Sequence, residues 1–366
     1  MESFFIPTKI IFGLQCIAEN HSLFRSLGKK ALIVTGKNSA VVCGALDDVL
    51  EALKAEKIDY VIYNGITENP TLDSVEHGRN VFKEEMCDFV IAIGGGSPID
   101  AAKAIAVLGI NNMRLRDVFS PCFYDKAAPL IAIPTTSGTG TEATPYSVIT
   151  DVKWHTKEGF GAPCLFPTIS FCDPKYTLTM SDKVTRDTGI DALSHLLEGV
   201  YSKKRSNLLM PIIAKGIELV FDNLAAALDD PGDVDARSAM MQASLYGGMA
   251  IAHTGTTLQH SIGYPVTTEF GVSHGLSNGI FMKYIMQLYH PHIATEIDEM
   301  LYYIGLDREE FYAWLNEMGL DDEKLELSDE FIKKAVPEVM NSRNMALNPM
   351  QVTEKDVIKL YRDVRK

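Results

Sequence analysis

The sequence FVIAIGGGSPID, residues 89–100, joins an apolar run to three consecutive glycines and a helix start. Residues 89–93 are continuously apolar, which is typical of a strand buried on both faces of a sheet. Ser97 favours a helix N-cap and Pro98 the first helical position, so we expect the glycines at a strand-to-helix turn. Such a turn can bind a pyrophosphate, although a plain tight turn explains the residues equally well. The spacing is not G-x-G-x-x-G, because Ile99 replaces the last glycine.

Similar apolar runs recur through the first half of the chain and alternate with helical patterns. Buried strands are expected at residues 31–36, 60–63, 130–133 and 168–172, and an edge strand is expected at residues 4–12. Helical spacing covers residues 46–54 and 72–84. This alternation predicts an α/β fold with a mostly parallel sheet that helices cover on both faces.

The pattern changes near residue 180, beyond which no segment has the character of a strand. Helices are expected at residues 187–200, 206–228, 236–253, 276–289, 294–304, 308–317, 329–340 and 353–364. A chain of 366 residues is long enough for two domains. We therefore expect an α/β domain over residues 1–182 and an all-α domain over residues 183–366.

Asp191 and His195 lie four residues apart in a run of good helix formers. Positions i and i+4 share one face of a helix, so the carboxylate and the imidazole can converge on one point. Such a pair suits a divalent metal ion such as Fe(II) or Zn(II). Taken alone, the pair is more commonly an ordinary contact between helical side chains.

Two later histidines, His260 and His274, extend this pattern. They are separated by Gly263, Pro265 and Gly271, which are expected to interrupt a continuous helix. The chain is predicted to leave one helix at His260 and to begin another near His274. Two helix ends could then bring both imidazoles to the same metal ion.

The order and spacing of these four residues resemble the metal ligands of the iron-containing, or group III, alcohol dehydrogenases. The resemblance covers nearly the whole chain and is closest to the NADP-dependent butanol and 1,3-propanediol dehydrogenases. It implies an oxidoreductase that moves hydride reversibly between a primary alcohol or diol and NADP. Its catalytic and metal-binding residues would be Asp191, His195, His260 and His274, holding Fe(II) or alternatively Zn(II). A small alcohol or aldehyde substrate and a homodimer are implied as well.

The resemblance also implies that the α/β domain binds a dinucleotide and that the helical domain binds the metal ion. In that family GGGSxxD is the pyrophosphate loop, and a Thr-Thr pair contacts the cofactor. The matching residues are Gly94, Gly95, Gly96, Ser97, Asp100, Thr135 and Thr136, with Thr144, Lys157 and Leu178 as looser matches. Lys157 is equally consistent with a solvated surface lysine.

The tetrapeptide Gly36-Lys37-Asn38-Ser39 ends an expected strand and bears on the choice of cofactor. Enzymes that prefer NAD commonly place a carboxylate at such a strand end to hold the ribose 2′-hydroxyl. NAD-specific members of the resembled family carry Asp where this chain has Gly36. The three following side chains can donate to a 2′-phosphate. These residues predict a preference for NADP, with the use of both cofactors as the alternative.

One position departs from the resembled family. Many members carry a histidine, proposed for proton relay, four residues after the ligand that matches His260. This chain has Tyr264 there, and a phenol with an ordinary pKa of about 10 is a poorer relay near neutral pH. His253 is a candidate only by its proximity in sequence, so the proton path is unassigned.

Composition limits the other classes of function. A net charge of −14 without a basic cluster argues against nucleic-acid binding. Neither a signal peptide nor a run of 18 apolar residues is present, so no membrane span is expected. Six cysteines without a C-x-x-C motif indicate reduced thiols in a cytoplasmic protein.

Two enzyme classes with similar loops, the glycerol dehydrogenases and the dehydroquinate synthases, remain alternatives. Dehydroquinate synthases bind a phosphorylated substrate with lysines and arginines, whereas residues 189–200 and 255–280 contain neither. Glycerol dehydrogenases typically lack the complete pattern of one Asp and three His. A metal-dependent hydrolase could activate water with the Asp and the three His and bind a phosphate ester with the glycine-rich loops, but two such loops suit a dinucleotide better than one phosphate. The presence of all four metal ligands argues against a non-catalytic binding module.

Overall fold

The computed structural model describes residues 2–154, 156–320 and 323–366. None of the helices in these ranges is both long and apolar enough to span a bilayer. Two compact units are present. The α/β unit comprises Ile6–Met180 and Pro231–Met241, and the helical unit comprises the residues up to Phe5, Ser181–Asp230 and Gln242–Lys366.

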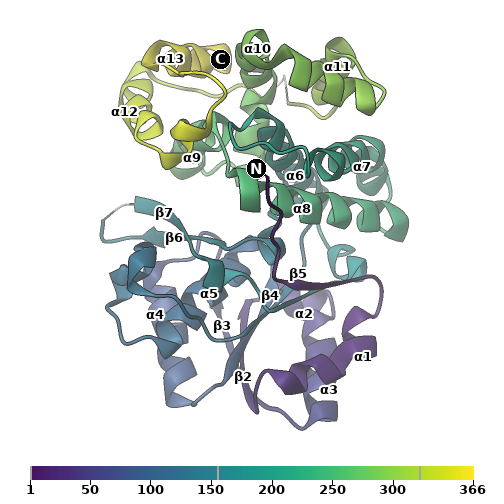
Figure 1. The fold of residues 1–366 in the computed structure, drawn as a ribbon, viewed down its shortest axis with the longest axis vertical. Helices are drawn as coiled ribbons and strands as arrows, with labels where there is room; N and C mark the ends of the chain where they lie inside the picture. The colour runs from purple at the N-terminus through teal and green to yellow at the C-terminus, as the bar shows by residue number, and fades with distance from the viewer. Residues whose placement is uncertain (1, 155, 321–322) are drawn as a thin grey trace. The chain divides into compact units, whose positions relative to one another are not determined.

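The α/β unit is built on a six-stranded sheet in the order β1-β8-β5-β4-β2-β3. Strands β2, β3, β4 and β5 of this sheet are labelled in Figure 1. The strands are β1 (Lys9–Phe12), β2 (Lys30–Gly36), β3 (Asp59–Ile66), β4 (Phe89–Gly94), β5 (Leu130–Pro134) and β8 (Ile169–Cys172). Every pairing in this sheet is parallel. The predicted α/β class with a mostly parallel sheet is thereby confirmed.

Alternate residues of the central strands enter two separate cores. Leu32, Val90 and Leu130 pack with α4 (Leu72–Glu84) and α5 (Gly96–Ile110). Their neighbours Ile33 and Ile91 pack on the other face with α1 (Cys16–Asn20) and α3 (Ala45–Glu56). The strands are continuously apolar because both faces are covered.

Three expectations for this unit need correction. The strand expected at residues 60–63 is the edge strand β3, where Tyr60 is 45% and Ile62 39% exposed. The first strand is confined to β1, so residues 4–8 lie outside it. An antiparallel hairpin of β6 (Tyr146–Asp151) and β7 (Thr156–Gly161) was not predicted, because its second strand is polar and glycine-rich.

The helices predicted beyond residue 180 are present, and their bounds lie near the predicted ones. The predicted helices are α6 (Asp182–Tyr201), α7 (Met210–Asp229), α8 (Val234–Thr254), α10 (His274–Tyr303), α11 (Arg308–Glu317), α12 (Asp329–Met340) and α13 (Glu354–Asp363). The first part of α8, up to Met241, belongs to the α/β unit. The helix α9 (Leu258–Phe270) was not predicted. Two helices expected at residues 276–289 and 294–304 are joined in α10 across a kink at Ile293, which follows Pro291.

The predicted helix end at His260 is wrong, because α9 continues from Leu258 through Gly263 and Pro265 to Phe270. Gly263 serves helix packing here, since a Cβ on it would lie 2.4 Å from Asn278 Oδ1 on α10. The chain turns at Gly271, whose φ of +64° suits glycine, and α10 begins at His274 as expected.

The first turn of α10 lies directly against α6. A Cβ added to Gly275 would be 1.8 Å from the carbonyl oxygen of Asp187 and 2.9 Å from the Cβ of Asp191. The nearest obstacle is backbone, which cannot rotate away as a side chain can. Glycine at position 275 therefore sets how closely the two helices approach.

We predict that Gly275→Ala lowers the free energy of unfolding by about 3 kcal/mol, because α10 must move away from α6. Urea denaturation would measure the change. Gly159→Ala is the control, because the nearest atom to its added Cβ is a Val148 methyl 3.8 Å away. A Gly275→Ala variant as stable as this control would contradict the close approach.

Two buried charges lie together beneath the loop that follows β5. Lys103 Nζ donates to the carbonyl oxygens of Thr141 at 2.8 Å and Tyr146 at 2.7 Å. Burial lowers the pKa of Lys103 to about 8. Burial raises the pKa of the Glu142 carboxyl from its ordinary 4.5 to about 7, although the charge of Lys103 opposes that shift.

The raised pKa of Glu142 has a consequence for stability. Between pH 4.5 and pH 7 the folded protein binds more protons at this carboxyl than the unfolded chain does. The stability that Glu142 provides is therefore complete below pH 4.5 and is lost as the pH rises through about 7.

We predict that Glu142→Gln removes this dependence. The free energy of unfolding of the variant, relative to that of the parent, should be higher at pH 8 than at pH 4.5 by up to about 3 kcal/mol. Urea unfolding of both proteins at the two pH values would measure it. An equal difference at both would show that Glu142 does not titrate between them.

Candidate functional site

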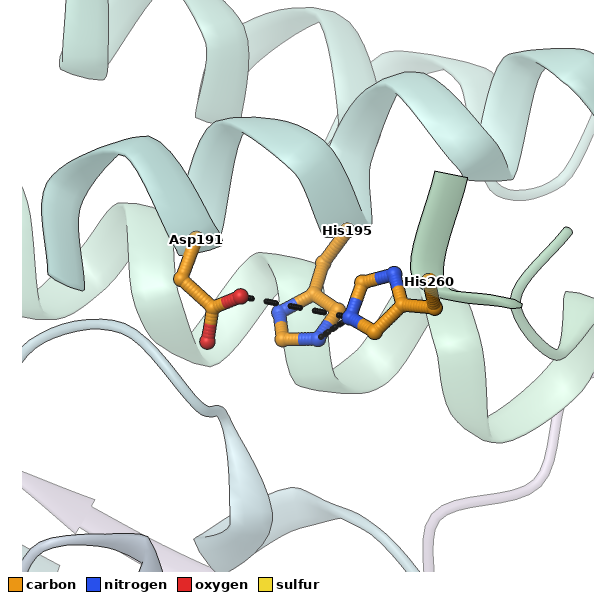
Figure 2. A group of neighbouring side chains, drawn as sticks. All are labelled: Asp191, His195 and His260. Atoms are coloured by element: carbon orange, nitrogen blue, oxygen red, sulfur yellow. Dashed lines mark hydrogen bonds and ion pairs between the residues drawn. The ribbon is translucent and has the colours of Figure 1, made fainter. Parts of the chain in front are cut away.

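One buried face of α6 carries the first two predicted metal ligands. The residues from Gly189 to Tyr201 are all buried. Asp191 and His195 are 3% and 5% exposed, and both project from one side of the helix (Figure 2). His260 reaches the same point from α9. The i, i+4 spacing thus places a carboxylate and an imidazole together, as the sequence predicted.

The four predicted ligands come together within the helical unit. The Nε2 atoms of His195 and His260 are 3.0 Å apart. Ligand atoms of Asp191, His195 and His260 all lie within 4.8 Å of one another. His274, at the start of α10, places its Nε2 atom 3.9 Å from Asp191 Oδ1. Their role as metal ligands remains a prediction, and these distances show that all four side chains lie close enough together to be tested as one site.

The spacing of these atoms fits a divalent metal ion. Two nitrogen ligands held about 2.1 Å from one tetrahedral ion lie about 3.4 Å apart. The observed distances lie on either side of this value. His195 Nε2 and His260 Nε2 are 3.0 Å apart, and His260 Nε2 is 3.9 Å from Asp191 Oδ1. The donor set of three imidazoles and one carboxylate suits Fe(II) or Zn(II).

The charges in this cluster stabilise one another. Burial by itself raises the pKa of Asp191, but the nearby charges of His195, His274 and His260 outweigh it, and the net pKa is lowered. The carboxylate is therefore in the ionised form that a metal ion requires.

The sequence analysis missed Glu198, which lies behind His260. Glu198 is fully buried on α6, and its Oε2 pairs with His260 Nδ1. Its Oε1 accepts hydrogen bonds from Thr257 N at 2.6 Å and Thr257 Oγ1 at 2.8 Å. Burial alone would raise the pKa of Glu198. The charge of His260 and these hydrogen bonds have the larger, opposite effect, so the net pKa is lowered.

Asn278 is the second residue that the sequence analysis missed. Its Nδ2 lies 3.1 Å from Asp191 Oδ1, 3.2 Å from His260 Nε2 and 3.4 Å from His274 Nε2. Asn278 is fully buried and four residues after His274, on the same face of α10. That i, i+4 relation is the signal that could have identified it.

Tyr264 lies beside the cluster, and His253 is engaged elsewhere. The Tyr264 ring stacks on His274 with 5.3 Å between ring centroids and 14° between planes. Both ring nitrogens of His253 contact backbone groups: Nε2 accepts from Phe5 N at 2.9 Å, and Nδ1 lies 2.8 Å from Met249 O. His253 therefore anchors the beginning of the chain to α8.

In the α/β unit, the glycine-rich turn joins β4 to α5 as predicted, but the capping residues differ. Gly95 is the N-cap and α5 begins at Gly96, so the expectation that Ser97 caps the helix and Pro98 begins it is wrong. Gly94 has a φ of +153°, which favours glycine. Gly95 itself has an extended conformation, with φ −75° and ψ −160°, that other residues also adopt.

The glycine turn packs against the loop that follows β5. A Cβ on Gly95 would lie 3.1 Å from Thr136 Oγ1, and one on Gly96 would lie 2.9 Å from Thr139 Cγ2. Thr135 continues the pairing of β5 with β4 by donating its N–H to Gly94 O at 2.9 Å. The structure therefore brings the two predicted nucleotide-binding loops together at the carboxyl edge of the sheet.

Two hydroxyl groups in this loop are buried and available. Thr135 is 3% and Ser137 1% exposed. Within the part of the chain that the structure describes, neither Thr135 Oγ1 nor Ser137 Oγ has a hydrogen-bond partner. Buried polar atoms without partners are uncommon, so these two are candidates to contact a ligand.

Other predicted cofactor residues hold the loop in place. Asp100 accepts hydrogen bonds from Thr141 Oγ1 at 2.7 Å and Val148 N at 2.9 Å. The carbonyl oxygen of Thr144 accepts from Lys103 Nζ at 2.9 Å. In the structure, Asp100 and Thr144 therefore support the loop through contacts within the protein.

The remaining predicted cofactor residues lie at the surface or partly buried. Lys157 on β7 donates to Asn69 Oδ1 at 2.8 Å. Leu178 follows a short 3-10 helix and is half-buried. Gly36 ends β2, and the next three residues, Lys37, Asn38 and Ser39, are exposed. Because β2 and β4 are parallel neighbours, Gly36 lies at the same edge of the sheet as the glycine turn.

Comparison with known proteins agrees with this architecture. The model of the family "Iron-containing alcohol dehydrogenase" matches residues 7–174, and that of the family's C-terminal region matches residues 185–364. The NADPH-dependent butanol dehydrogenase of Clostridium saccharobutylicum is 32% identical over 78% of this chain and 74% of its own length. The NAD-dependent methanol dehydrogenase of Bacillus methanolicus is 32% identical over 78% and 75%.

The fold also matches a solved structure along its entire length. An iron-containing alcohol dehydrogenase from Thermotoga maritima superposes with a TM-score of 0.93, at 36% identity, over 100% of this chain and 99% of that one. Both halves of the sequence, the two-unit fold and the identity to curated oxidoreductases lead to one conclusion: the chain belongs to the iron-containing alcohol dehydrogenase family.

Proposed function

We propose that this oxidoreductase transfers hydride reversibly between a primary alcohol or diol and NADP at a divalent metal ion. The observation that carries the proposal is the convergence of Asp191, His195, His260 and His274 within the helical unit. We assign the metal to that unit and the dinucleotide to the α/β unit, with the division near residue 182. Butanol and 1,3-propanediol are the proposed substrates.

The proposed ligand residues determine the charge of the site. A bound Fe(II) or Zn(II) ion would act as a Lewis acid that favours the alkoxide form of an alcohol. Asp191 supplies one negative charge, and three neutral imidazoles supply none, so the ligand set neutralises only half the charge of a divalent ion. The remaining positive charge favours an anionic oxygen. Burial of Asp191 and His260 keeps water from competing for these ligands.

The proposed dinucleotide site rests on the edge of the sheet. At the N-terminus of α5, the free N–H groups and the positive end of the helix dipole point toward the glycine turn, which favours a pyrophosphate there. Thr135 and Ser137 offer buried hydroxyls in the adjacent loop. The relatives include NADPH- and NAD-dependent enzymes, so the choice of cofactor for this chain rests on its own residues.

Gly36 supports NADP as that cofactor. The position leaves room for a larger residue, since the nearest atom to an added Cβ is Ile66 O at 3.5 Å. No carboxylate is present there to repel a 2′-phosphate, and Lys37 follows it on the surface. A lysine at a strand end provides the charge that a phosphate requires.

A cytoplasmic homodimer is part of the proposal. The six cysteines, all in described parts of the chain, are free thiols, which is typical of a reducing compartment. β1 lies at one edge of the sheet and pairs on one side only, with β8. An edge strand of this kind can pair with a second copy of the chain.

We predict that the Fe(II)-loaded protein, kept anaerobic, oxidises NADPH in the presence of butanal or 3-hydroxypropanal. Absorbance at 340 nm follows the reaction, with NADH as the parallel cofactor and a chelated sample as control. Asp191→Asn should lower kcat/KM by at least about 100-fold, because an amide is a weak metal ligand. Full activity after chelation would disprove the metal site, and exclusive use of NADH would disprove the cofactor assignment.

We predict that Gly36→Asp shifts the ratio of kcat/KM for NADPH over NADH by at least about tenfold toward NADH. The new carboxylate would repel the 2′-phosphate and accept a hydrogen bond from a 2′-hydroxyl. Gly36→Asn is the matched control, because it adds a side chain of the same size without the charge. Equal shifts in the two variants would mean that bulk, and not charge, is responsible.

A further inference from the structure

Glu198 combines full burial with an unusually complete set of polar contacts. It lies on α6 three residues after His195 and seven after Asp191, so it shares the face that carries both. One carboxylate oxygen accepts from the N–H and the hydroxyl of Thr257, and the other faces His260 Nδ1. A buried carboxylate of this kind is stable only because its oxygens have donors.

The same carboxylate caps helix α9. Thr257 is the N-cap of α9, yet its side chain accepts no hydrogen bond from the helix. Its hydroxyl donates to Glu198 instead, and the His260 N–H lies 3.4 Å from the same oxygen. Glu198 thus places a negative charge at the positive end of the α9 dipole.

The contact with Nδ1 determines where His260 carries its proton. An ionised carboxylate can only accept, so the Nδ1 atom that faces it must carry hydrogen. In the neutral ring, the lone pair then lies on Nε2. That Nε2 is the atom that faces His195 Nε2 at 3.0 Å and Asp191 Oδ1 at 3.9 Å.

We propose that Glu198 is a positioning residue of the metal centre, which fixes the Nδ1–H tautomer of His260 and thereby presents Nε2 to the ion. The inference rests on the proposed metal site, because it concerns one of that site's ligands. Hydrogen bonds behind a ligand commonly change metal affinity by about 10- to 100-fold. Glu198 touches neither the ion nor the substrate in this role.

An isosteric substitution isolates the tautomer. In Glu198→Gln, the amide oxygen can still accept from Thr257, while the amide NH₂ faces His260 Nδ1. The NH₂ group can only donate, so it favours the tautomer with hydrogen on Nε2. Metal binding must then reverse that preference. Thr257→Val is the matched control, because it disturbs the start of α9 but leaves the carboxylate against Nδ1.

The test measures the Zn(II) dissociation constant of full-length protein by competition with a chromophoric chelator. We expect Glu198→Gln to raise this constant at least about tenfold and Thr257→Val to change it by less than about threefold. In parallel, nitrogen-15 NMR of histidine-labelled, Zn(II)-loaded parent should show a proton on His260 Nδ1. Loss of that signal in His260→Gln would assign it.

The outcomes separate the two ideas. A parent protein that binds no Zn(II) would overturn the metal site and the role of Glu198 together. A parent that binds Zn(II) while Glu198→Gln binds equally well would overturn only the role of Glu198. Equal weakening in Thr257→Val would do the same, because the start of α9 would then be the cause. If Glu198→Gln does not fold, the NMR spectrum decides, since a proton on Nε2 of His260 in the parent contradicts the proposal.

Discussion

The helical unit depends on the pairing of buried charges along one face of α6. Asp191, His195 and Glu198 occupy positions i, i+4 and i+7, so a single rigid element sets their spacing. Buried carboxylates require partners, and α6 obtains them from the helices that follow. Glu198 is paired with the start of α9, while Asp187 accepts a 2.5 Å hydrogen bond from Ser273 at the start of α10. The contacts that stabilise the buried carboxylates of α6 therefore also fix the starts of α9 and α10, which carry His260 and His274.

The sequence predicted β2, β4, β5 and β8 because each of these strands is apolar enough to be buried on both faces. It misplaced β3 because an edge strand rich in tyrosine and isoleucine has the same local character as a buried one. The β6–β7 hairpin escaped notice because no two-residue turn motif joins its strands. Gly263 and Pro265 suggested a helix end, but tertiary packing overrides that local preference where Gly263 meets Asn278.

Some residues of the candidate site could be predicted from the sequence and others could not. Asp191, His195, His260 and His274 stand out in sequence because their residue types are few and their spacing is characteristic. Glu198 and Asn278 do not, although both lie at helical spacing from a predicted ligand. A carboxylate or amide at such a position usually faces solvent, and only the packing of α9 and α10 against α6 shows that these two are buried.

The contact between the glycine turn and the neighbouring threonine loop bears on how such motifs evolve. Pro98 fills the space beside Gly94, and Thr139 fills the space beside Gly96, so protein side chains alone require glycine at both positions. A descendant that abandoned the cofactor would still be under selection to keep glycine at both positions. The glycine motif would then persist after nucleotide binding was lost. A glycine triplet in a distant homologue is therefore evidence of this loop packing as much as of nucleotide binding.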